Sequence, residues 1–336
     1  MKFAVIGAGS WGTALANLLG ENNHSVILWA REPEVVEGIN RNRHNPFFTS
    51  ELELNKNITA TNNLKDAVEN SELALLSIPS SFIGSVILPV KNELKKLKGI
   101  INVAKGFEQG TGKRISELIC NVLEIVPLSS EDKIACLSGP NIASEVALKK
   151  VGASVIAAPN EEVSRIFQEC LSTEYFRLYS QTDRTGVELG GTLKNIYAIG
   201  AGIVDGLNLG DNAKAAYLTR SLHEMMKLGV ALGGKATTFS GLAGLGDLIT
   251  TANSPMSRNH RLGEAIARGI SPKAFQSSTK MVIEGVEAAR IARDWGRKLN
   301  IQLPITEEIC NILFESSSAH DAAANLMKRS LKSELD

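Results

Sequence analysis

The sequence has few of the residues that build metal sites, disulfide frameworks or nucleic-acid surfaces. Its four cysteines are scattered through 336 residues without a CxxC pair, and its five histidines show no metal-ligand spacing. We therefore expect reduced thiols and no metal. Only 5% of the residues are aromatic, and Lys plus Arg equal Asp plus Glu at 36 each. Neither base stacking nor a basic field indicates a nucleic-acid partner.

The chain also lacks a long hydrophobic run. The longest strongly apolar stretch, residues 196–204, is interrupted by glycines and followed by Asp205. It is far shorter than the roughly 20 residues that a membrane span requires. The first expected strand begins almost at Met1, which leaves no room for a signal peptide. We expect a cytoplasmic protein without a membrane span, long enough for two domains.

The two halves of the sequence have different patterns. Up to about Tyr179, short apolar runs alternate with amphipathic stretches, which is typical of a mostly parallel sheet flanked by helices. Beyond it, Ala, Leu, Gly and Lys recur at helical spacing. The sequence predicts an α/β Rossmann-like domain over residues 1–180 and an all-α domain over residues 181–336. The expected strands are residues 3–6, 25–29, 73–78, 100–103, 134–137 and 154–157.

A glycine motif directly follows the first expected strand. Residues 7–12 read GAGSWG and open a helix expected over residues 13–19. In a GxGxxG turn the first glycine makes the turn, the second admits the pyrophosphate, and the third lets helix and strand pack closely. The N–H groups and the dipole of the helix attract the anion. The motif predicts a dinucleotide site with contacts from Gly7, Gly9, Ser10, Trp11 and Gly12.

The residues after the second expected strand bear on the choice of cofactor. That strand ends in Trp29-Ala30-Arg31-Glu32, where an acid often binds the ribose 2′-hydroxyl. Arg31 suits a 2′-phosphate, which favours NADPH, whereas the presence of Glu32 means that NADH binding stays possible. An ordinary exposed loop arginine would fit the same pattern.

Two further strand ends carry candidate polar groups. Lys105 follows the strand 100–103 with Gly106 beside it, and residues 138–143 (SGPNIA) form a second strand-to-helix turn. Because ligands bind outside the carboxyl ends of the strands in open α/β sheets, Lys105, Gly139 and Asn141 are expected at the cofactor crevice. A surface lysine and a purely structural turn are the alternatives.

The second half contains one cation in an otherwise apolar stretch. Lys194 lies among small and apolar residues in 189–204, where desolvation would lower its pKa toward the range useful for proton transfer. A lysine that reaches for solvent at a helix end is the alternative. Downstream, Asp247 closes the loop GLAGLGD, whose three glycines permit close backbone approach.

The segment after this loop is a candidate phosphate site. Ser257 is expected to cap a helix that runs through Arg268 and stops at Gly269. The N–H groups at the start of that helix and the guanidinium of Arg258 could bind phosphate oxygens. A plain capped helix is the alternative.

Seven motifs in a fixed order carry a family resemblance: GAGSWGTALA, NVAKGFE, LSGPNIASEVA, ELGGTLKNIYAIGAG, GLAGLGDLITT, SRNHRLG and VIEGVEAA. Together they resemble the bacterial-type NAD(P)-dependent sn-glycerol-3-phosphate dehydrogenase family over nearly the whole chain. The resemblance implies reversible reduction of dihydroxyacetone phosphate to sn-glycerol 3-phosphate, which feeds phospholipid synthesis. Related enzymes are commonly homodimers.

The resemblance also implies site residues. It implies Lys194 as the proton acceptor. In the mechanism that we expect, Lys105 holds the C2 oxygen or a neighbouring hydroxyl and its charge lowers the pKa of Lys194, while Asp247 orients this network. Asn141 stands where family members often carry Ser or Thr, so its contact could come from the backbone rather than the side chain. The implied cofactor contacts are Ser10, Trp11, Arg31, Lys105, Ala143, Arg258, Val282 and Glu284. The implied substrate contacts are Lys105, Gly139, Asn141, Lys194, Asp247, Ser257, Arg258 and Asn259.

Two other functions compete with this one. A related two-domain reductase, such as a 6-phosphogluconate-like or ketopantoate-like enzyme, would share the plan, but residues 257–259 favour a small phosphate ester. A non-catalytic NADPH sensor would have no need for Lys105, Lys194 and Asp247 together.

Overall fold

A computed structural model describes residues 1–49, 51–279, 282–331 and 333–334. The chain divides into two compact units. Unit 1 comprises residues 1–189 with 241–243, and unit 2 comprises residues 190–240 with 244–336. Each is described by itself below.

Unit 1 is built on one eight-stranded sheet with the order β3-β2-β1-β4-β5-β6-β7-β8. Neighbouring strands are parallel except for β6 and β7, which pair antiparallel. The predicted mostly parallel sheet is therefore confirmed, but β3 and β8, at its two edges, were not predicted. The strands are β1 (Lys2–Ile6), β2 (Ser25–Trp29), β3 (Ile58–Thr61), β4 (Leu73–Leu76), β5 (Gly99–Asn102), β6 (Ile134–Ser138), β7 (Gly152–Ala157) and β8 (Phe176–Gln181).

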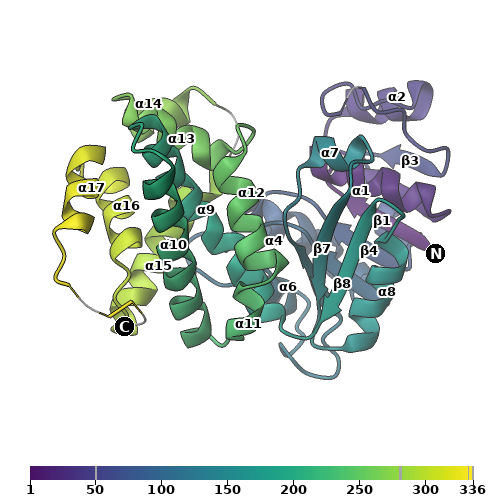
Figure 1. Cartoon of the computed structure of the whole chain (residues 1–336). Helices are drawn as coiled ribbons and strands as arrows, with labels where there is room; N and C mark the ends of the chain where they lie inside the picture. The colour runs from purple at the N-terminus through teal and green to yellow at the C-terminus, as the bar shows by residue number, and fades with distance from the viewer. Residues whose placement is uncertain (50, 280–281, 332, 335–336) are drawn as a thin grey trace. The chain divides into compact units, whose positions relative to one another are not determined.

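Helices cover both faces of this sheet (Figure 1). Successive residues of a strand point to opposite faces. Phe3 and Val5 of β1 accordingly pack with α1, α2 and α8, whereas Ala4 and Ile6 pack with α3, α4 and α6. The helices of this unit are α1 (Ser10–Glu21), α2 (Pro33–Asn42), α3 (Leu64–Glu69), α4 (Ile83–Ile87), α5 (Lys91–Leu94), α6 (Ile115–Val122), α7 (Ala143–Ala147) and α8 (Glu161–Leu171), with 3₁₀ turns at Ser80–Phe82 and Leu88–Val90.

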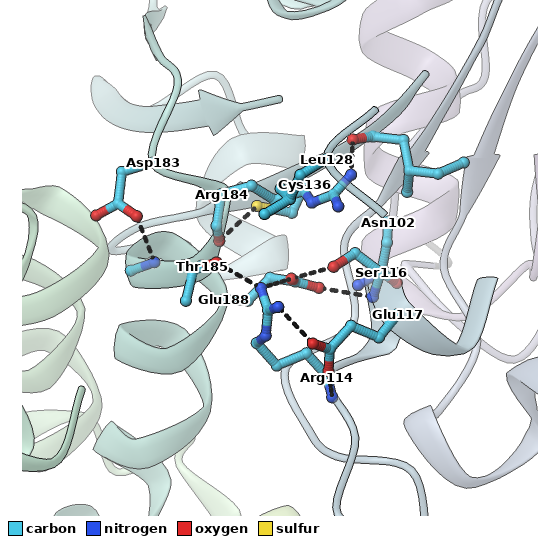
Figure 2. Close-up of polar contacts among 12 residues, drawn as sticks. Asn102, Arg114, Ser116, Glu117, Leu128, Cys136, Asp183, Arg184, Thr185 and Glu188 are labelled. Atoms are coloured by element: carbon cyan, nitrogen blue, oxygen red, sulfur yellow. Dashed lines mark hydrogen bonds and ion pairs between the residues drawn. The ribbon is translucent and has the colours of Figure 1, made fainter. Parts of the chain in front are cut away.

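The long helix α9 (Arg184–Gly206) starts in unit 1, where buried charges hold its first turns (Figure 2). The guanidinium of Arg184 donates to both carboxylate oxygens of Asp132 at 2.7 Å, and both side chains are fully buried. One turn later, Glu188 accepts hydrogen bonds from the backbone N–H and the hydroxyl of Ser116. Arg114 donates to Thr185 at 2.7 Å. These contacts fix the start of α9 on the sheet domain.

The residues described for unit 2 form helices joined by loops, with no strand among them, which confirms the predicted all-α second half (Figure 1). None of the helices described in either unit is long and apolar enough to cross a membrane. Besides α9, unit 2 contains α10 (Asp211–Ala231), α11 (Ala236–Phe239), α12 (Asp247–Asn253), α13 (Arg258–Ala267), α14 (Pro272–Ser277), α15 (Glu284–Lys298), α16 (Pro304–Phe314) and α17 (Ala319–Met327). A π-helical turn, Leu242–Gly246, directly precedes α12.

Helices α9 and α13 touch through their backbones. A Cβ atom built on Gly202 would lie 2.0 Å from the carbonyl oxygen of His260, and one built on Gly263 would lie 1.9 Å from that of Ile199. No larger residue fits at either position without moving a helix axis. The separation of α9 and α13 is therefore set by glycine.

A buried carboxyl group caps another helix of unit 2. Glu224 of α10 is 4% exposed and accepts hydrogen bonds from the N–H groups of Ile305 (2.6 Å) and Thr306 (3.1 Å), at the start of α16. Burial raises the pKa of Glu224 to about 7, because the loss of hydration outweighs these hydrogen bonds to the carboxylate.

We predict that Glu224 makes stability pH-dependent. A folded-state pKa of about 7, above the ordinary 4.5, gives a stabilisation that is complete below pH 4.5 and is lost as the pH rises through 7. The loss amounts to about 1–3 kcal/mol. Glu224→Gln keeps an acceptor for α16 and removes the titration. Its free energy of unfolding, from urea denaturation, should fall less between pH 5 and pH 8 than that of the wild type. Parallel curves would contradict this prediction.

Candidate functional site

Two glycines of the GxGxxG turn are required by the fold itself. Gly7 has φ +111°, and a Cβ there would lie 2.4 Å from the carbonyl oxygen of Ser77. A Cβ on Gly12 would lie 1.9 Å from the carbonyl oxygen of Gly7. The first and third glycines thus make the turn and the close strand–helix packing, as the motif predicts.

Gly9 has a different environment. It is the N-cap of α1 with φ −72° and ψ 178°, which any residue can adopt, and a Cβ there would meet no atom within 4 Å. The protein therefore has no packing need for glycine at this position. The first turn of α1 has neither a side-chain cap nor an acidic residue. Open space over an uncapped helix start fits the pyrophosphate of a dinucleotide.

The other predicted residues near this turn have distinct surroundings. Ser10 is exposed, whereas Trp11 is partly buried and packs edge-on against Phe176, with ring centroids 6.3 Å apart. Arg31 lies beyond the end of β2 with 84% of its side chain exposed, and its guanidinium contacts Glu32 at 2.8 Å. An exposed ion pair of this kind contributes little. Arg31 can therefore exchange Glu32 for a phosphate group at small cost.

The structure brings Lys105 and Gly139 together in unit 1. The Nζ atom of Lys105 donates to the carbonyl oxygen of Gly139 at 2.9 Å. Gly139 has φ +149°, and a Cβ there would lie 2.5 Å from the hydroxyl of Ser154. Both predicted residues thus lie at the carboxyl end of the sheet, beyond β5 and β6, as the strand-end pattern predicts.

The side chain of Asn141 has an acceptor atom that no other described residue contacts with a hydrogen bond. Ser154 Oγ donates its one hydrogen to the carbonyl oxygen of Ser138 (2.6 Å), so it must accept from Asn141 Nδ2 (2.9 Å). This fixes the orientation of the amide and leaves Asn141 Oδ1 buried, with no hydrogen-bond partner in the part of the chain that the structure describes. Such an atom requires an explanation, and a bound donor would supply one. Ala143, half-buried, begins α7 in the same turn.

Lys194 is buried in unit 2 and bound by two side chains. It is 6% exposed, and its Nζ donates to Asp247 Oδ1 at 2.8 Å and to Thr251 Oγ1. Asp247, 1% exposed, begins α12 directly after the π-helical turn. The alternative of a lysine that reaches for solvent is therefore wrong. Asp247, predicted to orient the network around Lys194, forms a buried ion pair with it.

The residue after Lys194 ties three helices together. Asn259 Nδ2 of α13 donates to Asn195 Oδ1 at 2.9 Å, and the N–H of Gly285, in α15, donates to Asn259 Oδ1 at 3.0 Å. The side-chain amide of Asn259 thus joins α9, α13 and α15. Its backbone N–H, in the first turn of α13, is the group that remains for a ligand.

The start of α13 matches the predicted capped helix. Ser257 Oγ accepts the N–H of His260 at 3.2 Å, so Ser257 is the N-cap, and Gly269, with φ +84°, follows the end of the helix. Arg258 is exposed and donates to the carbonyl oxygen of Val282 at 2.7 Å. Three of the predicted residues, Arg258, Val282 and Glu284 at the start of α15, therefore lie along one region of unit 2.

Sequence reasoning missed Thr251 and Asn195. Thr251 lies one helical turn after Asp247, so the i, i+4 spacing on an expected helix could have indicated it. Asn195 had no signal other than its position beside Lys194. Among the described residues there is no cluster of three side chains suited to a metal ion.

The GxGxxG turn at β1 and α1, together with a buried lysine–aspartate pair in a helical unit, defines an NAD(P)-dependent oxidoreductase. Family models agree: that of the N-terminus of NAD-dependent glycerol-3-phosphate dehydrogenase matches residues 2–164, and that of its C-terminus matches residues 183–324. The chain belongs to this family.

Individual relatives match over the whole length. The chain is 42% identical to the NAD(P)+-dependent glycerol-3-phosphate dehydrogenase of Citrifermentans bemidjiense, with 99% of this chain and 98% of the relative covered. It is 43% identical to that of an Exiguobacterium species, with 99% and 97% covered. The crystal structure of glycerol-3-phosphate dehydrogenase from Coxiella burnetii has a TM-score of 0.89 and 35% identity, covering 98% of this chain and 99% of that one. The predicted family, enzyme class and NAD(P) dependence are confirmed.

We predict that Gly9 serves the cofactor and not the fold. Gly9→Val should leave the melting temperature nearly unchanged, since its side chain would meet no protein atom, but should weaken NADPH binding by at least about 10-fold through loss of contacts to the pyrophosphate. Gly12→Ala is the matched control, and it should destabilise the fold. Protein fluorescence titration with NADPH and thermal melting make the measurements. Unchanged affinity in Gly9→Val would disprove the assignment.

Proposed function

We propose that the chain catalyses the reversible, NADPH-dependent reduction of dihydroxyacetone phosphate to sn-glycerol 3-phosphate and so supplies phospholipid synthesis. The observation that carries this proposal is the buried contact of Lys194 with Asp247 and Thr251, in the same unit as the capped start of α13. Lys194 offers a proton at a defined place, and the start of α13 offers hydrogen-bond donors to a phosphate ester. The names of the relatives are in accord with this substrate.

Proton transfer is the proposed role of Lys194. When bound, the nicotinamide cofactor supplies a hydride to the C2 carbonyl carbon. Lys194 Nζ donates a proton to the C2 oxygen, and in the reverse direction it accepts the hydroxyl proton. Asp247 stabilises the ammonium form and, with Thr251, directs Nζ. The proposal that Lys105 lowers the pKa of Lys194 stays a prediction.

The start of α13 is the proposed phosphate site. The Ser257 hydroxyl is used by the N–H of His260, which leaves the N–H groups of Arg258 and Asn259 for phosphate oxygens. The Arg258 guanidinium adds two parallel donors. Because glycine contacts set the distance between α13 and α9, they limit how far the phosphate site can lie from Lys194. A separation limited in this way selects substrates by the distance between phosphate and carbonyl.

The remaining assignments are proposals of the same kind. We propose that the division at residue 180 separates a cofactor domain from a substrate and catalytic domain, and that the enzyme is cytoplasmic and a homodimer. The orphan acceptor of Asn141 supports a side-chain contact to a substrate hydroxyl. The proposed cofactor contacts are Gly7, Gly9, Ser10, Trp11, Gly12, Arg31, Lys105, Ala143, Arg258, Val282 and Glu284, and the proposed substrate contacts are Lys105, Gly139, Asn141, Lys194, Asp247, Ser257, Arg258 and Asn259.

An absorbance assay tests the proposed reaction. Purified protein with NADPH should consume it when dihydroxyacetone phosphate is added, and far more slowly with unphosphorylated dihydroxyacetone, 6-phosphogluconate or ketopantoate. The same assay with NADH measures cofactor preference. Cofactor binding without turnover of any of these compounds would instead support a sensor.

We predict a large loss of turnover in Lys194→Ala. Removing a positioned acid or base should lower kcat about 100-fold or more. The Kd for NADPH should change less than twofold, because the proposed contact of Lys194 is with the substrate. Lys227→Ala, at an exposed lysine of α10, is the control and should retain full activity. Turnover at the wild-type rate in Lys194→Ala would refute the assignment.

We predict that Arg31 discriminates between the two cofactors. Arg31→Ala should weaken NADPH by about 10- to 150-fold, the range for a hydrogen bond to a charged group, and NADH by far less. Arg41→Ala removes another exposed arginine of the same unit, paired with Glu37, and should change neither affinity. Equal losses of NADPH and NADH affinity in Arg31→Ala would show that Arg31 does not bind the 2′-phosphate.

A further inference from the structure

His260 has no part in the chemistry described so far, yet it is held at two points in unit 2. It is the third residue of α13 and is 5% exposed. Its backbone N–H donates to Ser257 Oγ at 3.2 Å, and its ring Nε2 lies 2.7 Å from Asp205 Oδ2 of α9. One residue thus connects the N-cap of the proposed phosphate site with the helix that carries Lys194.

The direction of the bond between His260 and Asp205 follows from its acceptor. Burial raises the pKa of Asp205, but hydrogen bonds from Lys214 and His260 outweigh burial and hold this pKa below its ordinary value. Asp205 is therefore a carboxylate and can only accept, so Nε2 of His260 carries the hydrogen and donates it. Lys214 of α10 donates to the same oxygen at 2.6 Å. The other charged group near the ring is Glu264, 4.0 Å from Nδ1.

The close backbone contacts around His260 do not by themselves fix the orientation of α13. The carbonyl oxygen of His260 lies where a Cβ of Gly202 would be, which sets how closely α13 approaches α9. Contacts of this kind limit the distance between the helices but not the rotation of α13 about its own axis. Directional hydrogen bonds do limit this rotation. The Asn259 amide bonds Asn195 of α9 and Gly285 of α15, and the short bond from His260 to the Asp205 carboxylate adds a second link to α9, whose strength depends on direction. Rotation of α13 would move the Arg258 side chain and the N–H groups of its first turn.

We propose that His260 is a positioning residue: its bond to Asp205, together with the bonds of the Asn259 amide, fixes the first turn of α13, and with it the donors to the substrate phosphate. This inference rests on the function proposed above. His260 touches no substrate in this scheme, and its contribution lies in the binding of the phosphate ester.

Three variants test this inference. His260→Phe keeps a ring of similar size without the donor, and Asp205→Ala removes the acceptor at a partly exposed position. Each should raise the KM for dihydroxyacetone phosphate and the Ki of inorganic phosphate about 10-fold, the low end for one hydrogen bond to a charged group. The KM for NADPH should stay within about twofold. The double variant should be no worse than either single one. In His260→Gln the terminal amide can replace Nε2–H, so its values should return toward those of the wild type.

Two comparators calibrate the result. Arg258→Ala removes a proposed phosphate ligand and sets the upper limit of the loss. Lys214→Met removes the other donor to Asp205 but not the link to α13, so its KM should match that of the wild type. A lower melting temperature with unchanged KM and Ki in both His260→Phe and Asp205→Ala would overturn the inference, as would failure of His260→Gln to recover.

Failure of the proposed function is distinguishable from failure of this inference. If the wild type does not reduce dihydroxyacetone phosphate, the proposed reaction is wrong, but binding of inorganic phosphate can still be measured by calorimetry without turnover. About 10-fold weaker phosphate binding in His260→Phe and Asp205→Ala would then support the positioning role on its own. Equal binding in wild type and variants would overturn it. If His260→Phe does not fold, Asp205→Ala decides.

Discussion

The buried ion pair between Lys194 and Asp247 is the interaction on which the arrangement of unit 2 depends. An ammonium group that loses its hydration needs a carboxylate and further hydrogen bonds nearby. The fold meets this need by bringing Asp247 of α12 to Lys194 of α9. A π-helical turn directly precedes Asp247, and within it Gly244 packs against the backbone of Phe239. Thr251, one turn further along α12, accepts a second hydrogen bond from the Lys194 ammonium group. Such turns are often found at functional sites, where the backbone must aim one side chain.

The parts of the site that could be predicted from the sequence depend on local chemistry. The GxGxxG turn needs glycine at 7 and 12 for reasons that lie within a dozen residues, and Ser257 caps a helix that starts at the next residue. A strand in the interior of a buried sheet shows a continuous apolar run in the sequence. The edge strands β3 and β8 do not, because each has a neighbour on one side only and carries polar residues.

The parts that could not be predicted are pairings between residues far apart in the chain. Nothing near Asp205 indicates that His260 donates to it, and nothing near Glu224 indicates that it caps a helix beginning at Pro304. The amide of Asn259 lies within a motif expected to bind substrate, yet it binds Asn195 and Gly285. A motif shows which residue types chemistry requires, whereas only the fold shows which of them are already engaged by the protein itself.

The glycine contacts between α9 and α13 also limit how this sequence can vary. At positions 202 and 263 even alanine would overlap a backbone carbonyl of the opposite helix, so accepting it means moving a helix axis. The helices carry Lys194 and Arg258, so a packing change there would alter the distance between the proposed proton donor and the proposed phosphate ligand, along with the stability of the fold. Evolution toward a longer or shorter substrate could therefore begin with substitutions at this interface, without a change in any of the proposed ligand contacts.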